Sequence, residues 1–251
     1  MSKVAIITGS GGGIGDALVK TYLNDRFYVI GLDKKPSTIK KPNFTYIKTD
    51  LFIFSKQTTY RKKIIKEIKE KFPNKLTKLV LINNAALQIL NPVEKISWDN
   101  WLSSITVNTI SPFFLVQSFL KELKLTNGHV VNISSVHAKV TKPNFLTYAA
   151  SKAALESITK SLSIELSRFG ISINGIAPAA ISTEMLLAGF KNKPEQYKKL
   201  NECHPSKSIG SPSDVSNLAK LITDNNNQFM TGSIIDLDGG ISSLLVDPDN
   251  G

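Results

Sequence analysis

The sequence predicts an α/β fold: a single Rossmann-type domain in which helices cover both faces of a doubly wound parallel sheet of about seven strands. Three observations support this prediction. Short apolar, β-branched runs alternate with longer amphipathic segments along the 251 residues. The first apolar run leads directly into a glycine-rich turn and a helical pattern. No repeat or linker divides the sequence, so we expect one domain over residues 1–251.

The apolar runs mark the strands, because parallel strands that are buried on both faces carry nearly continuous apolar residues. The predicted strands are 4–8, 28–32, 44–48, 79–82, 129–133, 172–176 and 233–237. The predicted helices are 14–24, 57–71, 98–123, 148–169 and 212–222. A long irregular stretch rich in lysine covers residues 185–208. We expect it to form a lid over the substrate, since long loops are commonly functional, and a lineage-specific insertion is the alternative.

The basic charge of the chain comes from lysine rather than arginine. The formal net charge is +11, yet only three of the 31 basic residues are arginine, namely Arg26, Arg61 and Arg168. Lysines around Arg61 alternate with Ile64 and Ile68, which is the pattern of the solvent face of an amphipathic helix. No nucleic-acid-binding motif accompanies the charge, so we expect no nucleic-acid partner.

The single cysteine, Cys203, excludes an internal disulfide and suits a reducing compartment. No apolar run approaches the ~20 residues that a membrane span needs. The first strand follows Met1, Ser2 and Lys3 directly, which leaves no room for a signal peptide. We therefore expect a soluble cytoplasmic protein without membrane contact. Cys203 and His204 have no metal-ligand partners nearby in the sequence, so we expect no metal site.

The turn after the first strand reads Thr8-Gly9-Ser10-Gly11-Gly12-Gly13-Ile14-Gly15. A strand, a glycine-rich turn and a helix in this order provide what a dinucleotide site needs. A backbone without side chains can approach a pyrophosphate closely, and the helix N-terminus offers unpaired N–H groups and the positive end of its dipole. The turn therefore predicts a dinucleotide-binding site.

Asp33 ends the second strand and predicts the choice of cofactor. An acidic side chain there can accept hydrogen bonds from the adenosine ribose hydroxyls and would repel a 2′-phosphate, which favours NAD over NADP. Lys34 and Lys35 follow at once and could accept a phosphate, which keeps NADP as the alternative. A simple turn residue is the other interpretation of Asp33.

Tyr148 and Lys152 are about one helical turn apart, so they project from the same face of a helix. An ammonium beside a phenol favours the phenolate, so we expect the pKa of Tyr148 to lie below its reference value of about 10. Ser135 lies 13 residues before Tyr148 and can hold a carbonyl or alcohol oxygen, with Ser134 as the alternative. This set predicts proton transfer to and from an oxygen atom while another group moves a hydride.

These motifs together resemble the classical short-chain dehydrogenase/reductase family, in the family's order and over nearly the whole chain. The matching positions are Thr8-Gly9-x-x-x-Gly13-Ile14-Gly15, Asn83-Asn84-Ala85-Ala86, Asn108, Ser135, Tyr148, Lys152, the segment from Asn174 to Thr183, Thr231-Gly232 and Asp238-Gly239-Gly240. Ala86 and Ala179 stand where the family usually has glycine, which puts the local loop shape in question.

The resemblance implies roles for four catalytic residues. Tyr148 protonates a carbonyl oxygen or deprotonates an alcohol, and Ser135 fixes that oxygen beside it. Lys152 stabilises the phenolate and holds the nicotinamide ribose. Asn108 shapes its helix and holds a water molecule that links Lys152 to solvent, and a purely structural role of Asn108 is the alternative.

The resemblance also implies the residues that contact the cofactor. This set is Thr8, Gly9, Gly13, Ile14, Gly15, Asp33, Asp50, Leu51, Asn83, Ala85, Tyr148, Lys152, Pro178, Ile181 and Thr183. The residues after the third strand are expected near the adenine, and those after the fourth strand beside the adenosine. The backbone of Ile181 and the hydroxyl of Thr183 are expected at the nicotinamide carboxamide.

The resemblance implies an NAD(H)-dependent oxidoreductase that transfers a hydride between nicotinamide and a small secondary alcohol or ketone. A β-ketoacyl carrier-protein reductase that uses NADPH is the alternative, and a non-catalytic cofactor sensor is a further one. The intact set of Asn108, Ser135, Tyr148 and Lys152 argues against a sensor, because a sensor needs no proton donor.

Two further expectations concern the substrate and the assembly. His137, Lys139 and Lys142 follow the catalytic serine and indicate a cationic or hydrogen-bonding wall, so the substrate would carry a carboxylate or phosphate. A solvent-facing loop is the alternative. The helices predicted at 98–123 and 148–169 have more apolar positions than one sheet contact uses, and the family pairs these helices, so we expect a homotetramer or a homodimer.

Overall fold

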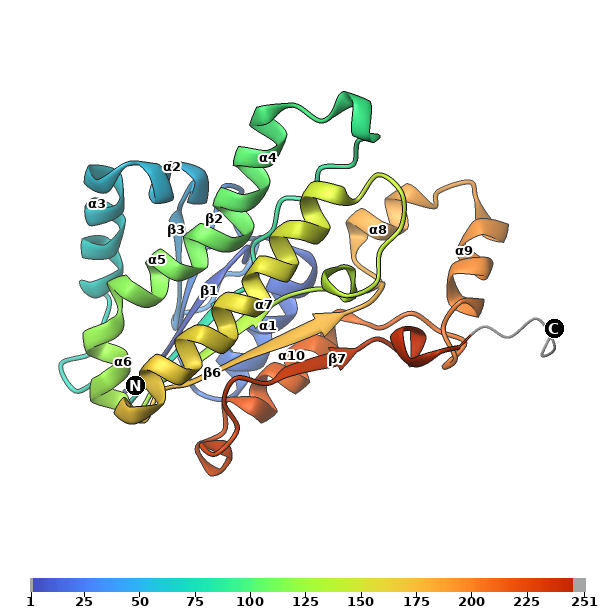
Figure 1. Cartoon of the computed structure of the whole chain (residues 1–251). Helices are drawn as coiled ribbons and strands as arrows, with labels where there is room; N and C mark the ends of the chain where they lie inside the picture. Colours follow the sequence, from blue (N-terminus) through green and yellow to red (C-terminus); the bar gives the residue numbers. More distant parts are fainter. Residues whose placement is uncertain (1, 246–251) are drawn as a thin grey trace.

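The computed structural model of the chain describes residues 2–245 and shows one sheet of seven parallel strands (Figure 1). The strands are β1 (Lys3–Thr8), β2 (Tyr28–Asp33), β3 (Phe44–Lys48), β4 (Lys78–Asn83), β5 (His129–Ile133), β6 (Ser172–Pro178) and β7 (Ile234–Leu237). Their order across the sheet is β3-β2-β1-β4-β5-β6-β7. The predicted Rossmann-type α/β fold is confirmed, and each predicted strand is present.

Helices cover both faces of this sheet (Figure 1). They are α1 (Gly13–Asn24), α2 (Leu51–Lys56), α3 (Thr58–Lys69), α4 (Trp98–Ile105), α5 (Ser111–Ser118), α6 (Leu120–Thr126), α7 (Leu146–Leu166), α8 (Glu184–Gly189), α9 (Pro194–Glu202) and α10 (Pro212–Ile222). Successive side chains of β1 enter opposite layers. Val4 and Ile6 join the core that includes α2, α3, α5 and α6, whereas Ala5 and Ile7 join the core formed with α1 and α10.

The strand order reverses beside β1, because β2 and β3 lie on one side of it and the remaining strands on the other. In open α/β sheets, ligands bind at the carboxyl ends of the strands next to such a reversal. The ends of β1 and β4 meet there, since the Thr8 hydroxyl accepts hydrogen bonds from the N–H groups of Asn84 and Ala85 at 2.9 and 3.0 Å. The fold therefore places the predicted site at this edge.

The helix predicted over 98–123 is interrupted, which corrects the prediction of one continuous element. α4 ends at Ile105, a π-helical turn covers Thr106–Ile110, and α5 and α6 follow with a break at Phe119. The π-helical turn carries Asn108, which is buried and has hydrogen-bond partners outside its own helix. Such turns within α-helices are frequent at functional sites.

The stretch 185–208, predicted as irregular, contains most of α8 and all of α9. The Thr183 hydroxyl caps α8 by accepting a hydrogen bond from the N–H of Leu186. Pro194 opens α9, at a position where its missing N–H is not needed. The stretch is therefore largely helical, and its role as a substrate lid stays a prediction.

Candidate active site

The glycine-rich turn between β1 and α1 requires glycine at specific positions. Gly9 and Gly13 have φ angles of 66° and 55°, which residues with side chains rarely adopt. A Cβ atom on Gly15 would lie 1.8 Å from the carbonyl oxygen of Gly9, so α1 packs directly onto the turn. The N–H of Gly9 donates to the carbonyl oxygen of Leu32 at 2.8 Å, which fixes the turn against β2.

The outer side of this turn is open. A Cβ atom on Gly12 would meet no atom of the described residues within 4 Å apart from Gly12 itself and its two neighbours in the chain. Gly12 directly precedes α1, and no side chain of the described residues caps this N-terminus. The unpaired N–H groups of the first helical turn and the positive end of the helix dipole lie at this position. A turn without side chains at a helix N-terminus fits the pyrophosphate of a dinucleotide.

Asp33 lies at the end of β2 and faces the glycine turn. Its carboxylate accepts hydrogen bonds from the N–H groups of Gly11 at 2.8 Å and Lys35 at 3.0 Å. The carboxylate is thereby held where the adenosine ribose of a dinucleotide lies in this class of fold. Asp50 follows β3 and caps α2 by accepting hydrogen bonds from two N–H groups of the helix, and Leu51 is buried at the first position of α2.

Asn83 and Ala85 lie two residues apart at the carboxyl end of β4 but in different surroundings. The Asn83 side chain is buried, and its Nδ2 donates to Oδ1 of Asn132 on β5 at 2.7 Å. Ala85 lies against the glycine turn, because a Cβ atom on Gly9 would be 2.9 Å from the Ala85 Cα. Of these two predicted cofactor contacts, the structure places Ala85 at the turn and the Asn83 side chain between the central strands.

The segment after β6 also reaches the glycine turn. Pro178 ends β6, and Ile181 forms an isolated parallel bridge with Gly210. A Cβ atom on Gly13 would lie 3.0 Å from Cγ2 of Thr183. The structure therefore brings the predicted nicotinamide segment next to the predicted pyrophosphate turn, although the two are far apart in the sequence.

Ser135, Tyr148 and Lys152 meet where β5 ends against α7. The Lys152 side chain is 1% exposed, and its Nζ donates to the carbonyl oxygen of Ile133 at 2.6 Å. The same Nζ lies 5.7 Å from the centre of the Tyr148 ring. The Ser135 side chain lies close enough to Tyr148 to oppose the rise of its pKa, and the Ser135 hydroxyl accepts a hydrogen bond from the N–H of His137 at 3.2 Å. The predicted proton-transfer groups are thus assembled from the end of one strand and one face of a helix.

Burial governs the proton affinities of these groups. It raises the pKa of Tyr148 above its ordinary value, although the hydrogen bond with Ser135 opposes the shift. Burial also lowers the pKa of Lys152 from 10.5 to about 7. The predicted lowering of the Tyr148 pKa by a neighbouring ammonium is therefore wrong. The reason is that a site of low dielectric constant disfavours the phenolate and the ammonium alike.

Asn108 joins three parts of the site. Its Oδ1 accepts from the Leu87 N–H at 2.7 Å, and its Nδ2 donates to the Leu87 carbonyl oxygen at 2.9 Å. Nδ2 also donates to Oγ of Ser151 at 2.9 Å, and that hydroxyl donates to the Tyr148 carbonyl oxygen at 2.7 Å. Sequence reasoning missed Ser151, although it directly precedes Lys152, because its partner comes from another helix.

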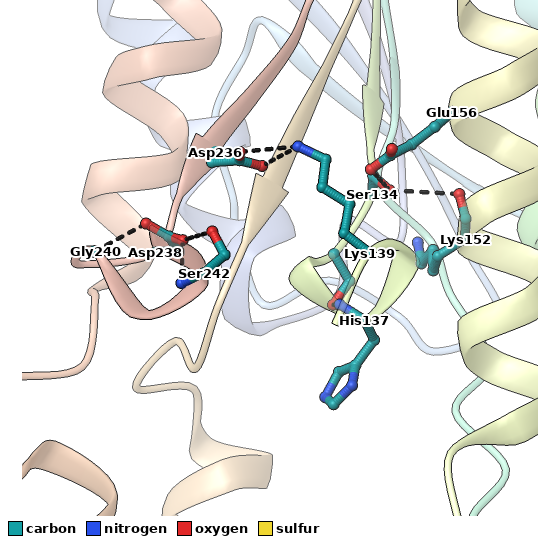
Figure 2. Close-up of polar contacts among 10 residues, drawn as sticks. Ser134, His137, Lys139, Lys152, Glu156, Asp236, Asp238, Gly240 and Ser242 are labelled. Carbon is teal, nitrogen blue, oxygen red and sulfur yellow. Dashed lines mark hydrogen bonds and ion pairs between the residues drawn. The ribbon is translucent and has the colours of Figure 1, made fainter. Parts of the chain in front are cut away.

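Ser134 and Glu156 form a second buried link that the sequence did not indicate (Figure 2). The Ser134 hydroxyl donates to Oε1 of Glu156 at 2.9 Å, and Glu156 is 7% exposed. Glu156 follows Lys152 by about one helical turn, so this bond ties α7 to the end of β5. The two neighbouring serines therefore have different partners: the Ser134 hydroxyl bonds Glu156, whereas the Ser135 side chain influences the pKa of Tyr148.

Aromatic rings extend the site beyond Tyr148. The His137 ring stacks on the Phe145 ring with centres 4.2 Å apart, and it lies edge-on to the Tyr148 ring at 6.1 Å. Figure 2 shows the His137 ring extending away from the ends of the strands. Burial, assisted by the charge of Lys142, lowers the pKa of His137, so the ring is neutral near pH 7.

Lys139, predicted with His137 and Lys142 to form a cationic wall, is engaged elsewhere. Its Nζ lies 2.7 and 2.8 Å from the two carboxylate oxygens of Asp236 on β7 (Figure 2). This ion pair offsets the charge of Lys139. Lys142, by contrast, has its Nζ 4.9 Å from the centre of the Phe145 ring, which is stacked on the His137 ring.

Residues 2–245 contain no group of three or more His, Cys, Asp or Glu side chains that could hold a metal ion. In the same part of the chain, every helix is too short or too polar to cross a bilayer.

Comparison with known proteins defines the class to which this fold and site belong. Residues 3–194 match the sequence model of the short chain dehydrogenase family. The chain therefore belongs to the classical short-chain dehydrogenase/reductase family of oxidoreductases, and the resemblance inferred from its motifs is confirmed.

Three similar proteins show the range of this class. A 3-oxoacyl-[acyl-carrier-protein] reductase of Chlamydia pneumoniae is 28% identical over 96% of this chain and 98% of its own length. The structure of 4-hydroxyisoleucine dehydrogenase complexed with NADH is 28% identical, with a TM-score of 0.86 over 97% of this chain and 100% of that chain. A further structure of that dehydrogenase is complexed with NADH and succinate. ElxO with NADP bound is 25% identical, with a TM-score of 0.87 over 97% and 100% of the two chains.

Proposed function

We propose that this protein is an NAD(H)-dependent oxidoreductase that interconverts a small secondary alcohol and the corresponding ketone. The observation that carries the proposal is the assembly of Ser135, Tyr148 and Lys152 at the same edge of the sheet as the open glycine turn. A nicotinamide cofactor, when bound, supplies the hydride chemistry. The residues that would hold it are the turn from Thr8 to Gly15, Asp33, Ala85 and the segment from Pro178 to Thr183.

The side chains of this site perform the proton transfer. In reduction, Tyr148 donates its hydroxyl proton to the carbonyl oxygen, and in oxidation it accepts the proton of the alcohol. Ser135 donates a hydrogen bond to the same oxygen and holds it within reach. The raised pKa keeps Tyr148 protonated near neutral pH, as a proton donor in the reduction requires, whereas in the oxidation the phenol must first release its proton to solvent before it can accept that of the alcohol. As Tyr148 passes its proton to the substrate, Lys152, with a pKa of about 7, takes up a proton from solvent, and its positive charge then stabilises the phenolate.

The cofactor we propose is NAD rather than NADP. The Asp33 carboxylate is held by two backbone N–H groups beside the glycine turn, where it can accept hydrogen bonds from both ribose hydroxyls. A 2′-phosphate at this position would be repelled by the carboxylate. An NADPH-dependent carrier-protein reductase is the second candidate, favoured by the similarity to the Chlamydia pneumoniae enzyme.

The surroundings of Tyr148 support a substrate that carries a carboxylate. Lys142 lies beside the stacked rings of His137 and Phe145 and can attract an anion, while the neutral His137 can form a hydrogen bond. A structure of the similar 4-hydroxyisoleucine dehydrogenase is complexed with NADH and succinate, a dicarboxylate, which supports this proposal. We therefore propose a hydroxy acid or keto acid as the substrate.

Exposed apolar side chains on α4 and α7 support self-association. Trp98 on α4 is 76% exposed and Ile164 on α7 is 77% exposed. We propose a homotetramer or a homodimer, located in the cytoplasm, where the single cysteine stays reduced. Light scattering tests the assembly, because a mass equal to one chain of 27.5 kDa contradicts it.

The function is tested by NAD⁺-dependent oxidation of a panel of secondary alcohols with and without a carboxylate, followed by the absorbance of NADH. Tyr148→Phe is expected to abolish turnover and to retain NADH binding. Tyr28→Phe is the matched control, because the Tyr28 hydroxyl bonds Thr45 on β3, away from the catalytic set. Turnover that persists in Tyr148→Phe contradicts the proposed role of this residue, and equal rates with neutral alcohols contradict the acidic substrate.

A further inference from the structure

Two residues beside Asp33 form an ion pair at the predicted adenosine site. Lys34 follows Asp33 directly, and its Nζ lies 2.9 Å from Oδ2 of Asp50. Lys34 extends from the end of β2, and Asp50 lies between the end of β3 and the start of α2. The ammonium that could attract a 2′-phosphate is therefore already paired with a carboxylate.

Asp50 is the fixed partner of this pair. Its Oδ1 accepts hydrogen bonds from the N–H groups of Phe52 at 2.9 Å and Ile53 at 3.2 Å, which caps α2. Its own N–H donates to the Tyr60 hydroxyl at 3.1 Å. The Asp50 side chain is 27% exposed, whereas the Lys34 side chain is 63% exposed. The hydrogen bonds that cap α2 and the bond from the Asp50 N–H therefore fix the position of Oδ2. The more exposed Lys34 side chain extends from β2 to reach this oxygen.

We propose that Asp50 is a specificity-determining residue that lowers the affinity for NADPH by withholding Lys34 from the 2′-phosphate. This inference rests on the proposed function, in which Asp33 lies at the adenosine ribose. Two charges act in the same direction: the Asp33 carboxylate repels the phosphate, and the Asp50 carboxylate offsets the lysine that would attract it. NADH has no phosphate at this position, so its affinity does not depend on the pairing of Lys34.

The two roles of Asp50 can be separated by one substitution. Asparagine is as good an N-terminal cap as aspartate, so Asp50→Asn keeps the acceptor for the N–H groups of α2 and removes the charge that holds Lys34. Asp50→Ser, which also caps helices, is the second variant. Any contact of residue 50 with the adenine affects both cofactors alike, because they share the adenine. The ratio of the two affinities therefore isolates the effect on the phosphate.

The experiment is calorimetric titration of the full chain with NADH and with NADPH at low salt. Asp50→Asn is expected to improve the affinity for NADPH relative to NADH by about fivefold. This factor corresponds to one contact between exposed opposite charges, here between Lys34 and the 2′-phosphate. Lys34→Met alone is expected to change this ratio by less than about twofold, because the wild-type lysine is already paired. In the double variant Asp50→Asn/Lys34→Met, the ratio is expected to return to the wild-type value. Raising the salt concentration tenfold should reduce the gain.

Three outcomes overturn the inference. An unchanged ratio in both Asp50 variants shows that Asp50 does not set the preference. A gain that survives in the double variant shows that Lys34 is not the group released. A wild-type protein that binds neither cofactor overturns the proposed function together with this inference, whereas the first two outcomes leave the proposed function intact. Thermal melting of each variant confirms that the change in affinity is measured on folded protein.

Discussion

The Nζ atom of Lys152 lies 2.6 Å from the carbonyl oxygen of Ile133, the last residue of β5. This hydrogen bond fixes α7 to the sheet at the level of Tyr148 and leaves the amine almost completely buried. Removing an amine from water disfavours its charged form, which lowers the pKa of Lys152 to about 7. The site therefore has an amine that changes charge near neutral pH, at the expense of stability.

Lys152→Met is expected to abolish turnover and to raise the free energy of unfolding at pH 6 by on the order of a few kcal/mol. The unfolded chain keeps its proton up to pH 10.5, but the folded protein releases it near pH 7. The stability of the wild type therefore rises between these pH values. Urea unfolding at pH 6, 8 and 10 should show the advantage of the variant shrinking with pH, and an advantage that grows with pH contradicts the account.

One added methyl group at Gly12 or Gly15 should weaken NADH binding in both cases but should lower stability only at Gly15. Gly15→Ala places a Cβ atom 1.8 Å from the Gly9 carbonyl oxygen, so both stability and NADH binding should fall. The methyl group of Gly12→Ala meets no atom of the described residues within 4 Å beyond residue 12 and its two neighbours in the chain, so the fold should persist. NADH affinity should fall, because the methyl group occupies the place of the pyrophosphate. Gly189→Ala, equally unhindered within the described chain, is the control that should retain NADH affinity. Normal NADH binding by Gly12→Ala places the cofactor elsewhere.

The link from Asn108 through Ser151 to the Tyr148 carbonyl oxygen predicts coupled substitutions. Asn108→Ala removes three hydrogen bonds of a buried amide and should lower the free energy of unfolding by about 2–3 kcal/mol. Ser151→Ala should cost about 1–2 kcal/mol, and the two effects should be less than additive because they share one bond. Ser161→Ala, at an exposed position of α7, is the control and should change stability by less than about 0.5 kcal/mol. Strict additivity argues against the link.

His129 predicts a loss of stability in acid. Its ring is buried, its Nδ1 lies 2.7 Å from the Ser172 hydroxyl, and burial, followed by the charge of Lys78, lowers its pKa from 6.5 to about 4. The unfolded chain therefore binds a proton before the folded protein does, and stability falls as the pH drops from 6.5 to 4. His129→Gln, which can still bond Ser172, should reduce this fall by about 3 kcal/mol or less. Equal slopes in wild type and variant contradict the assignment.

The strands and the catalytic motif were predictable because their signals are local. Each strand is a short apolar run, and the spacing of Tyr148 and Lys152 follows from the pitch of a helix. The π-helical turn was not predictable, since it accompanies contacts of Asn108 with Leu87 and Ser151 that only the folded chain brings together. The helices of the predicted lid did leave local signals, a Thr183 cap and the N-terminal Pro194, which sequence reasoning overlooked.

Sequence spacing does not provide the electrostatic features that depend on distant parts of the chain. Lys139 lies beside His137 in sequence, but its partner Asp236 is 97 residues away. The expected pKa of Tyr148 assumed a charged neighbour, whereas the depth of burial of both Tyr148 and Lys152 decides the direction of the shift. Sequence spacing indicates which groups can meet, and their hydration is set by the packing of the whole fold.

The choice between NAD and NADP is decided by titrating the wild-type protein with NADH and NADPH side by side, at matched salt, by calorimetry. We expect saturable binding of both cofactors, with NADH the tighter ligand, because the Asp33 carboxylate repels the 2′-phosphate and Asp50 forms an ion pair with Lys34. Tighter binding of NADPH contradicts this assignment and favours the carrier-protein reductase. Binding of neither cofactor contradicts the oxidoreductase function itself.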